Sequence, residues 1–313
     1  MANSTLLALV QNTLQGMGVA TYGMPATVIG NTNQDVVQTL ALVNSEGDSL
    51  AHERDWQAQQ VQYLFTAVYY TYTGDFTSGS TTISNLSSTT GLTTNPTYFM
   101  LTGVPVPQDT FLVSVNAGAG TAVMNQAATA SGTAQSITFS QVLFAPPTGF
   151  DRQIDRTQWD KSKHWEMLGP ETPQQREWLR SGYISTGPRI RYWYMGGYFQ
   201  IWPPLGSTES LSFEYASKYW VLATAPTLLT PTKQAFTVDT DTCIFPDSLM
   251  RSMIRLKYLE AKGMDTTAAY MAYTAQRDLA KANDAGSPTL SMAPRVSEVL
   301  IGWENIPDST YGT

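Results

Sequence analysis

The chain has 313 residues, a net charge of −7, only 14% charged residues and a single cysteine, Cys243. Roughly a quarter of the residues are charged in an ordinary soluble domain, so neutral polar groups are over-represented here. Such a surface suits burial against neighbouring subunits, because removing a hydroxyl group from water costs less than removing an ion. The negative charge argues against a basic nucleic-acid clamp. One cysteine excludes an internal disulfide framework, and we expect it to be a buried apolar residue.

Metal, cofactor and membrane functions find no support in the sequence. The two histidines, His52 and His164, lie far apart, and no group of residues shows the spacing of a metal or phosphate site. We therefore expect no metal and no cofactor. No run of 18 apolar residues occurs, so no membrane span is predicted. The first residues lack the basic segment of a signal peptide, which favours synthesis in the cytoplasm.

The first zone of the chain, residues 1–60, is predicted to be helical. Asn3 or Ser4 can cap a first helix, because short polar side chains accept hydrogen bonds from the free amides of a first turn. Asn33 can cap a second helix in the same way.

Two changes of pattern follow. Gly47 interrupts the helical apolar pattern of Val36, Leu40 and Val43, and the pattern resumes over residues 50–60 with Trp56 as a core anchor. The period then changes to two, which predicts a strand. The alternating residues are Val61, Tyr63, Phe65, Ala67 and Tyr69.

Residues 77–140 differ in composition from both flanks. Their only charged residue is Asp109, and six glycines and three prolines separate short runs rich in Thr, Ser and Val. The alternating apolar residues in those runs favour a small all-β module over disorder. Because the composition changes sharply at both ends, we expect an insertion that folds independently and projects from the rest.

The third zone, about residues 141–245, continues in strands and turns and is rich in aromatic residues. The sequence GGYF at 196–199 predicts a hairpin turn that opens a strand. Arg189 and Arg191 alternate with apolar residues, so a strand would direct both arginines to one face. A subunit salt bridge is the favoured role for these arginines over a nucleic-acid contact, because the chain is negatively charged.

A group of interleaved charged residues near residue 160 is the part of the sequence that could suggest an enzyme. They surround His164 and comprise Asp151, Arg152, Asp155, Arg156, Asp160, Lys161, Lys163, Glu166 and Glu171. A carboxylate pair or a metal site could use such acids. Alternating opposite charges are more typical of a solvated or interface pattern in which the acids pair with the bases. Since no nucleophile, base or phosphate motif is recognisable, we predict that the protein is not an enzyme.

A helical hairpin is predicted over residues 246–285. Pro246 suits the first turn of its first helix, Gly263 suits the end of that helix, and Asp265 can cap the second helix. An apolar row on the first helix is predicted to face a core. Its members are Leu249, Met250, Met253, Ile254, Leu256 and Tyr258.

The rest of the hairpin suggests contacts with another helix. Asp247 and Arg251 have the i,i+4 spacing of an ion pair. On the second helix, Ala269, Ala272 and Tyr273 are predicted to form a packing face, because small side chains permit close approach. The spacing leaves open whether that approach occurs within one subunit or between subunits.

Three stretches occur in a fixed order: PPTGFDRQIDRTQWDKSKHWEMLGPETPQQREWLRSG, GPRIRYWYMGGYFQIWPPLGSTESLSFEYASKYWV and TDTCIFPDSLMRSMIRLKYLEAKGMD. Together they resemble the head–tail adaptor (connector) proteins of tailed bacteriophages. The resemblance covers the N-terminal helices and about residues 141–285, and it implies an adaptor core of 1–76 and 141–285. It departs at 77–140, where the family usually has a short strand connection, so no family role is carried onto the inserted module.

The sequence and this resemblance predict an α+β fold with a helical core, a β-rich middle and a small inserted β module. The resemblance implies a structural virion protein at the head–tail junction, a homo-oligomeric ring of about twelve copies. The portal protein would lie above the ring and a tail tube or nozzle protein below it. Genomic DNA would pass through without specific binding, which an acidic lumen favours. The alternative is a β-rich tail component that binds a host receptor or carbohydrate, suggested by the insert and its aromatic residues.

Residues 286–313 are predicted to form an extended C-terminal arm, because three prolines oppose another long helix. The arm is too apolar to lie in water without a partner. Its apolar residues are Val296, Val299, Leu300, Ile301, Trp303 and Ile306. We predict that Trp303 anchors the arm in a portal protein or a neighbouring copy on assembly. The alternative is that the arm folds back on its own subunit.

Overall fold

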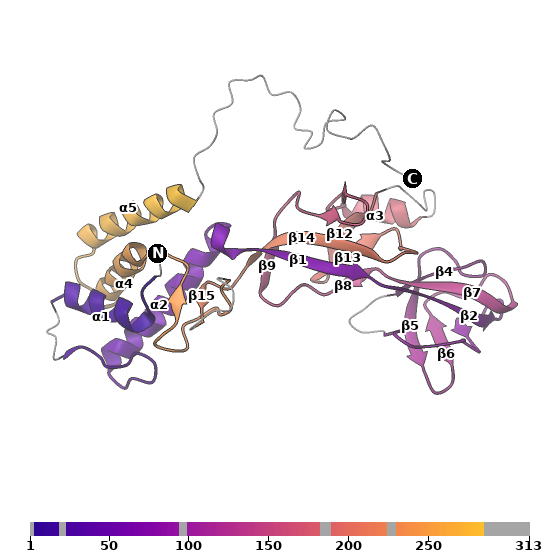
Figure 1. The fold of residues 1–313 in the computed structure, drawn as a ribbon, viewed down its shortest axis with the longest axis horizontal. Helices are drawn as coiled ribbons and strands as arrows, with labels where there is room; N and C mark the ends of the chain where they lie inside the picture. Colours follow the sequence, from indigo (N-terminus) through magenta and orange to yellow (C-terminus); the bar gives the residue numbers. More distant parts are fainter. Residues whose placement is uncertain (1–2, 19–22, 94–98, 182–188, 224–229, 285–313) are drawn as a thin grey trace, which may run out of the picture.

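The computed structural model describes residues 3–18, 23–93, 99–181, 189–223 and 230–284. The chain has an α+β fold, as the sequence predicts. Figure 1 shows an elongated molecule with helices at one end, a β-rich middle and a further sheet at the other end. We call these parts the helical lobe, the central region and the β module.

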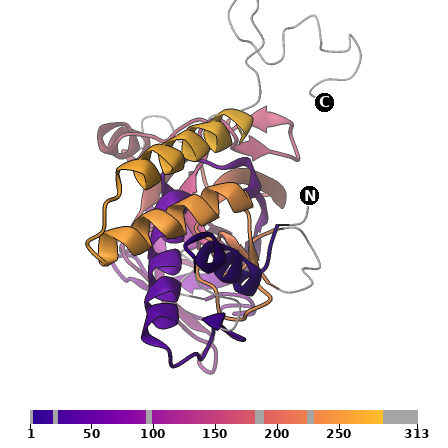
Figure 2. The same ribbon diagram turned by 90° about the vertical axis from the view of Figure 1, so that its left-hand side faces the viewer.

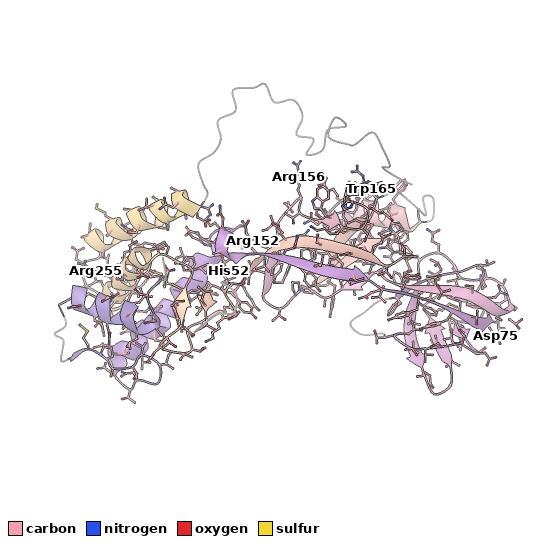
Figure 3. The ribbon with its side chains drawn as sticks, in the orientation of Figure 1. His52, Asp75, Arg152, Arg156, Trp165 and Arg255 are labelled. Carbon is pink, nitrogen blue, oxygen red and sulfur yellow. The ribbon has the colours of Figure 1, made fainter. Side chains whose placement is uncertain are left out.

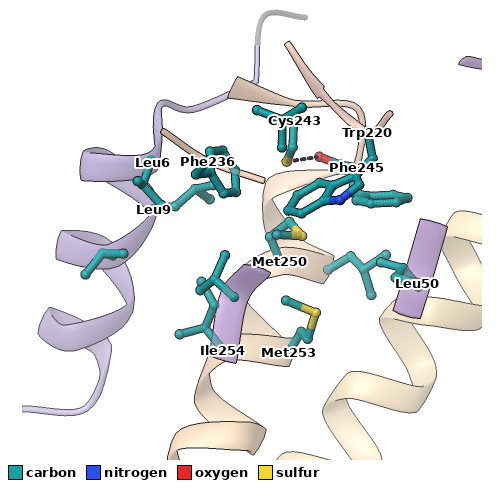
Figure 4. Close-up of a cluster of buried hydrophobic side chains, with 14 of the residues drawn as sticks. Leu6, Leu9, Leu50, Trp220, Phe236, Cys243, Phe245, Met250, Met253 and Ile254 are labelled. Carbon is teal, nitrogen blue, oxygen red and sulfur yellow. Dashed lines mark hydrogen bonds between the residues drawn. The ribbon is translucent and has the colours of Figure 1, made fainter. Parts of the chain in front are cut away.

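Four long helices form the helical lobe. They are α1 (Leu6–Gly16), α2 (Gln34–His52), α4 (Asp247–Ala261) and α5 (Thr267–Asp284). Figure 2 shows α4 packed between α5 on one side and α1 and α2 on the other. The predicted apolar row of α4 is buried apart from Tyr258, which is half-buried. The first four members of this row, Leu249, Met250, Met253 and Ile254, belong to one core with Leu6, Leu9, Trp220 and Phe245 (Figure 4).

The start of α1 differs from the prediction. Thr5 caps the helix, whereas Asn3 and Ser4 lie outside it. The Asn3 amide donates to the Cys243 carbonyl (2.6 Å), and Ser4 donates to the Asp247 carboxylate through its amide and its hydroxyl group. Asn3 therefore ties the first helix to strand β16 (Thr242–Cys243) and Ser4 ties it to the start of α4, partners that local sequence does not reveal.

The second helix begins as predicted and ends differently. Asn33 caps α2, which then runs through Gly47 without a break, so the predicted interruption is wrong. A Cβ atom at residue 47 would lie 2.3 Å from the ring of Trp220, so this glycine makes room for a buried tryptophan. The prediction that the helix resumes over residues 50–60 is also wrong, because α2 ends at His52.

Trp56 is a core anchor, as predicted. Its indole nitrogen donates to the Leu50 carbonyl (2.8 Å), and its ring meets Phe245 edge-on with ring centres 5.3 Å apart. The chain then passes through a short 3-10 helix, η2 (Gln57–Gln59), into strand β1 (Gln60–Ala67). The helical lobe is thus connected directly to the central region.

The predicted alternation after η2 belongs to two strands in different sheets. Strand β1 pairs along its whole length with β14 (Glu209–Ser217) of the central region. Strand β2 (Tyr69–Phe76) pairs with β7 (Gly132–Gln141) of the β module. The module's sheet therefore includes β2, which the sequence boundary at residue 77 assigns to the core. Alternation fixes the face of a strand, but it does not identify the partner strand.

The β module is a six-stranded sheet in the order β2-β7-β4-β5-β6-β3. Its remaining strands are β3 (Thr82–Ile83), β4 (Phe99–Thr102), β5 (Thr110–Asn116) and β6 (Thr121–Met124). The module encloses its own core, which includes Ile83, Phe99 and Phe139. The Gln141 amide donates to the Val68 carbonyl (2.9 Å), so the chain enters and leaves the module at one place.

The central region holds a sheet in the order β1-β14-β10-β11, with β9 beside β14, and a second sheet in the order β12-β13-β8. Its short strands are β8 (Leu143–Phe144), β9 (Phe150–Gln153), β10 (Trp159–Asp160), β11 (Trp165–Glu166), β12 (Arg191–Met195) and β13 (Tyr198–Trp202). The predicted hairpin turn is confirmed: Gly196 and Gly197 have φ of +59° and +84° between β12 and β13. Strands β15 (Val221–Leu222) and β16 (Thr242–Cys243) form a ribbon beside the helices.

One helix of the central region, α3 (Pro173–Arg180), was not predicted. Thr172 and Gln175 form a reciprocal capping box, and Pro173 occupies the first turn. This Thr-Pro-x-Gln signal is readable in the sequence. The aromatic-rich composition of this zone favours strands and turns, and the local capping signal is what produces the helix.

Candidate interaction surface on the helical lobe

The hairpin of α4 and α5 forms where the sequence predicts it, but Pro246 is the N-cap residue of α4 and not part of its first turn, and Asp265 lies two residues before α5. Gly263 has φ of +66°, a left-handed conformation that suits glycine at the end of a helix. The Asp265 carboxylate accepts a hydrogen bond from the Thr267 amide (3.0 Å) at the start of α5. These two residues reverse the chain and lay α5 along α4.

The inner side of α5 packs within the subunit. Ala269 and Ala280 are buried, and Tyr273 packs against the lobe's core. Ala272 is exposed. The two predicted contact alanines therefore differ: Ala269 touches its own subunit, and Ala272 faces outward.

The outer side of α5 carries a line of exposed apolar residues, which we call the α5 seam. The seam consists of Ala268, Ala272, Ala275, Leu279 and Ala282. Leu279 is 53% exposed, and Met271 beside the seam is 67% exposed. The residues of the seam are separated alternately by four and by three positions. This spacing is typical of the contact between two packed helices. The sequence contained this signal, although only Ala272 of the seam was singled out from it.

The seam has the properties of a helix-docking surface. Alanine side chains let another backbone approach closely, and Leu279 and Met271 supply most of the apolar area. Large exposed apolar residues that stand alone are ordinary, whereas a continuous row along one helix makes this surface a candidate for contact with another molecule.

A groove borders the seam. It lies among α1, α4 and α5 and has a volume of about 310 Å³. Its lining comprises Asn12, Thr13, Gly16, Ser248, Arg251, Ser252, Arg255, Ala269, Ala272 and Gln276. Gly16, Ala269 and Ala272 are small, which leaves space between the helices for a bulky side chain from elsewhere. Ala272 belongs to both features, so the groove opens onto the α5 seam.

Two arginines of α4 give the groove a positive charge. Arg255, labelled in Figure 3, lines the groove and forms no salt bridge with any described residue. Arg251 donates to the Asp247 carbonyl (3.3 Å) and not to its carboxylate, which is occupied by Ser4. The predicted Asp247–Arg251 ion pair is therefore absent from the described structure.

The other cations on α4, on α5 and in the turn between them have acidic partners within the lobe. Lys257 lies 3.4 Å from Glu46, Lys262 lies 2.7 Å from Asp35, and Lys281 lies 2.6 Å from Glu53. Arg277 also lies 3.6 Å from Glu53. Against this background, the two groove arginines stand out as positive charges that no described carboxylate pairs with.

The arginines predicted near β12 lie in the central region, away from the α5 seam. Arg191 forms an ion pair with Glu171, whose side chain is only 6% exposed. Arg189 is exposed and lies two residues before the start of β12, so the prediction that one strand carries both arginines is wrong. The salt bridge of Arg191 is therefore internal to the subunit.

The interleaved charges of the central region also find partners. Arg152 contacts Asp151 (2.7 Å) and Asp55 (2.6 Å). Lys163 contacts Glu209 (2.7 Å), which lies beside the buried Asp160. Burial raises the pKa of Asp160. Burial acts in the same direction on Glu209, but hydrogen bonds from Lys163 and Ser207 outweigh it and hold its pKa below the usual value.

The chemistry of the described residues is limited. Among them, no group of three or more His, Cys, Asp or Glu side chains could hold a metal ion. Cys243 is buried, as predicted, and burial raises the pKa of its thiol to about 12, which leaves it unreactive at neutral pH.

The predicted arm contacts cannot be placed on this surface. Val296, Val299, Leu300, Ile301, Trp303 and Ile306 all lie outside the described residues.

Comparison with known proteins adds no family assignment. A search of protein-family models finds no match, and a search of curated proteins finds none either. In the described part of the chain, no helix is long and apolar enough to cross a membrane.

Proposed function

We propose that the protein is a structural subunit of a homo-oligomeric ring, and that the ring is the head–tail adaptor of a tailed-bacteriophage virion. The observation that carries the proposal is the α5 seam, an exposed row of apolar residues with the spacing of a helix–helix contact. The motifs that resemble adaptor proteins supply the setting.

The position of the seam on α5 supports the proposal of a ring. The seam occupies the outer side of one helix, whose inner side is already committed to the subunit core. If a second copy packs on the seam through a different surface of its own, the contact is head-to-tail. Head-to-tail contacts close into a ring when the rotation between successive copies allows it. About twelve copies are expected from the resemblance, with no catalysis required of any residue.

The proposed setting defines the partners. The portal protein would contact one end of the ring and a tail tube or nozzle protein the other, and genomic DNA would pass through the lumen. The net charge of −7 supports a passage that does not retain a polyanion. No membrane takes part in this proposal.

Native mass measurement and negative-stain imaging of the purified chain test the proposal. Rings of about twelve subunits, each of 34.3 kDa, are expected either alone or with portal protein present. A trimer that binds cells or glycans would favour the alternative, a receptor-binding tail component. A chain that remains monomeric in both conditions would contradict the proposal.

A further inference from the structure

The groove among α1, α4 and α5 is shaped for an apolar side chain accompanied by acids. Its volume of about 310 Å³ is large enough for one or two large side chains, and its walls at Gly16, Ala269 and Ala272 present almost no side-chain atoms. On α4, Arg251 and Arg255 line the same groove without a carboxylate partner among the described residues. A fitting occupant therefore combines a bulky apolar group with negative charge.

One segment of this chain has that composition and no described position. Residues 296–306, VSEVLIGWENI, contain Trp303, two acids and no base. The acids are Glu298 and Glu304, and Glu304 directly follows the tryptophan. A carboxylate opposite an arginine gains a charge-assisted hydrogen bond, and partial burial in a groove strengthens it relative to water.

We infer that the groove binds residues 298–304 from the C-terminal arm of a second copy, with Trp303 between the helices and the two glutamates at Arg251 and Arg255. This inference rests on the proposed ring. It adds the location and the chemistry of one contact between neighbouring subunits.

The length of the arm permits this contact. Residues 285–302 separate the end of α5 from Trp303. An extended chain of that length spans about 60 Å, whereas α5 itself is only about 27 Å long. The segment can therefore cross to an adjacent subunit without any change in the described helices.

The position of Ala272 indicates that the donor is a second copy. Ala272 lines the groove and also belongs to the α5 seam. A neighbouring subunit that packs on the seam would lie at the mouth of the groove, and an arm of about 60 Å would bring its Trp303 within reach of the groove. Binding of the arm would then be coupled to ring assembly, because both contacts join the same two subunits.

A charge-exchange experiment with two full-length variants tests the inference. The first variant carries Arg251→Glu and Arg255→Glu, and the second carries Glu298→Arg and Glu304→Arg. In either variant alone, groove and arm have the same sign of charge, and we expect its oligomers to dissociate on the order of tenfold more readily than the parent. An equimolar mixture should recover parental assembly, because each arm then meets a groove of opposite charge on its neighbour.

The mixture separates an intersubunit contact from an internal one. If the arm folded into its own groove, mixing would not restore the charge match, so unrecovered assembly would overturn the inference. Parental assembly by each variant alone would also overturn it while leaving the ring intact. A monomeric parent would instead contradict the proposed function itself, and the inference with it.

A second measurement reads the contact directly. Ala272→Cys in one chain and Trp303→Cys in another should give a disulfide-linked heterodimer under mild oxidation. Pairing Ala272→Cys with Thr313→Cys provides the control for non-specific crosslinking. Equal yields from the two pairs, or crosslinking only when Ala272→Cys and Trp303→Cys share one chain, would contradict the contact between copies.

Discussion

The helical lobe and the β module each enclose a core of their own, but their surfaces differ. The β module, residues 69–141, has only two charged residues, and both have partners. Asp75 accepts hydrogen bonds from Asn85 (2.6 Å) and the Ala134 amide (2.7 Å), and Asp109 pairs with Arg180 of α3 (2.7 Å). The helical lobe instead presents a row of exposed apolar residues and two arginines that pair with no described carboxylate.

The two regions differ in how their exposed apolar residues are arranged. Exposed apolar residues also occur on the module, such as Val104 and Val113, but they come from different segments and form no helical row. Single exposed residues of this kind need no explanation. The ordered row on α5, together with the two groove arginines beside it, is the reason we propose that assembly involves the helical lobe.

The largest expected effect comes from Lys233→Met in the helical lobe. Lys233 lies 2.8 Å from Asp241, whose side chain is fully buried and also accepts hydrogen bonds from the Thr237 and Val238 amides. Removing the lysine leaves a buried carboxylate without its cation, and we expect a loss of about 3–5 kcal/mol in unfolding free energy. Hydrogen exchange measured by mass spectrometry should show the loss in the helical lobe and not in the β module.

The same pair predicts how stability depends on pH. Burial favours the neutral form of Asp241, but the hydrogen bonds from Lys233 and from the backbone outweigh it and hold the pKa below its usual value of 3.8. The contribution of this carboxylate is therefore complete above pH 3.8 and is lost as the pH falls through its lowered pKa.

Lys161→Met, at an exposed position, is the control for Lys233→Met and should leave the unfolding free energy nearly unchanged. If Lys233→Met and Lys161→Met lower the unfolding free energy equally, the Lys233–Asp241 pair makes no special contribution to stability.

Gly47→Ala should have the next largest effect. The new methyl group would lie 2.3 Å from the rigid, buried ring of Trp220, and we expect a loss of roughly 1–3 kcal/mol or more. Gly16→Ala on α1 is the matched control, because nothing lies within 4 Å of its added Cβ. Chemical denaturation followed by tryptophan fluorescence measures both. An unchanged midpoint for Gly47→Ala would contradict the assigned packing of α2.

Ala269 and Ala272 separate folding from assembly on one helix. Ala269→Trp should lower the unfolding free energy by about 1–3 kcal/mol, because this alanine is buried inside the subunit. Ala272→Trp should leave the melting temperature of the monomer unchanged and reduce assembly, because it adds bulk to the seam and the groove. The sequence predicts that both alanines belong to a packing face, without distinguishing the two contacts. The opposite result, a fold broken only by Ala272→Trp, would reverse the assignment of the faces.

Excision of the β module should have the smallest effect on the rest of the chain. We expect a short Gly/Ser linker in place of residues 69–141 to leave the melting of the helical lobe nearly unchanged, because the chain enters and leaves at the bonded Val68 and Gln141. Excision of 77–140 instead would strip β2 of its partner strand and expose its edge. If both deletions melt alike, β2 does not belong with the module.

Much of the fold was predictable because it depends on local signals. The Asn33 cap, the left-handed glycine at Gly263 in the turn of the helical hairpin, and the paired glycines before β13 each follow from residue chemistry within a few positions. The failures arose where a distant residue decides the outcome. Gly47 resembles an interruption of the helix, but the ring of Trp220 fills the space that a side chain at residue 47 would need. Ser4 resembles a helix cap, but it binds the Asp247 carboxylate instead.

The candidate surface was predictable only in part. Spacing indicated that the second helix of the hairpin carries packing alanines, but it could not show that Ala269 faces inward and Ala272 outward. The groove was not predictable, because it is formed by three helices from opposite ends of the chain. The absence of the predicted Asp247–Arg251 ion pair likewise depends on a distant residue. Ser4 binds the Asp247 carboxylate, and Arg251 donates to the Asp247 carbonyl instead.

The mass of two matched variants tests the central claim most directly. Leu279 on the α5 seam and Val113 on the β module are 53% and 54% exposed, so a glutamate at either position should cost the monomer's fold almost nothing. We predict that Leu279→Glu gives only the 34.3 kDa monomer under conditions where the parent forms rings, whereas Val113→Glu assembles like the parent. Full assembly of Leu279→Glu, or loss of assembly in Val113→Glu alone, would contradict the account.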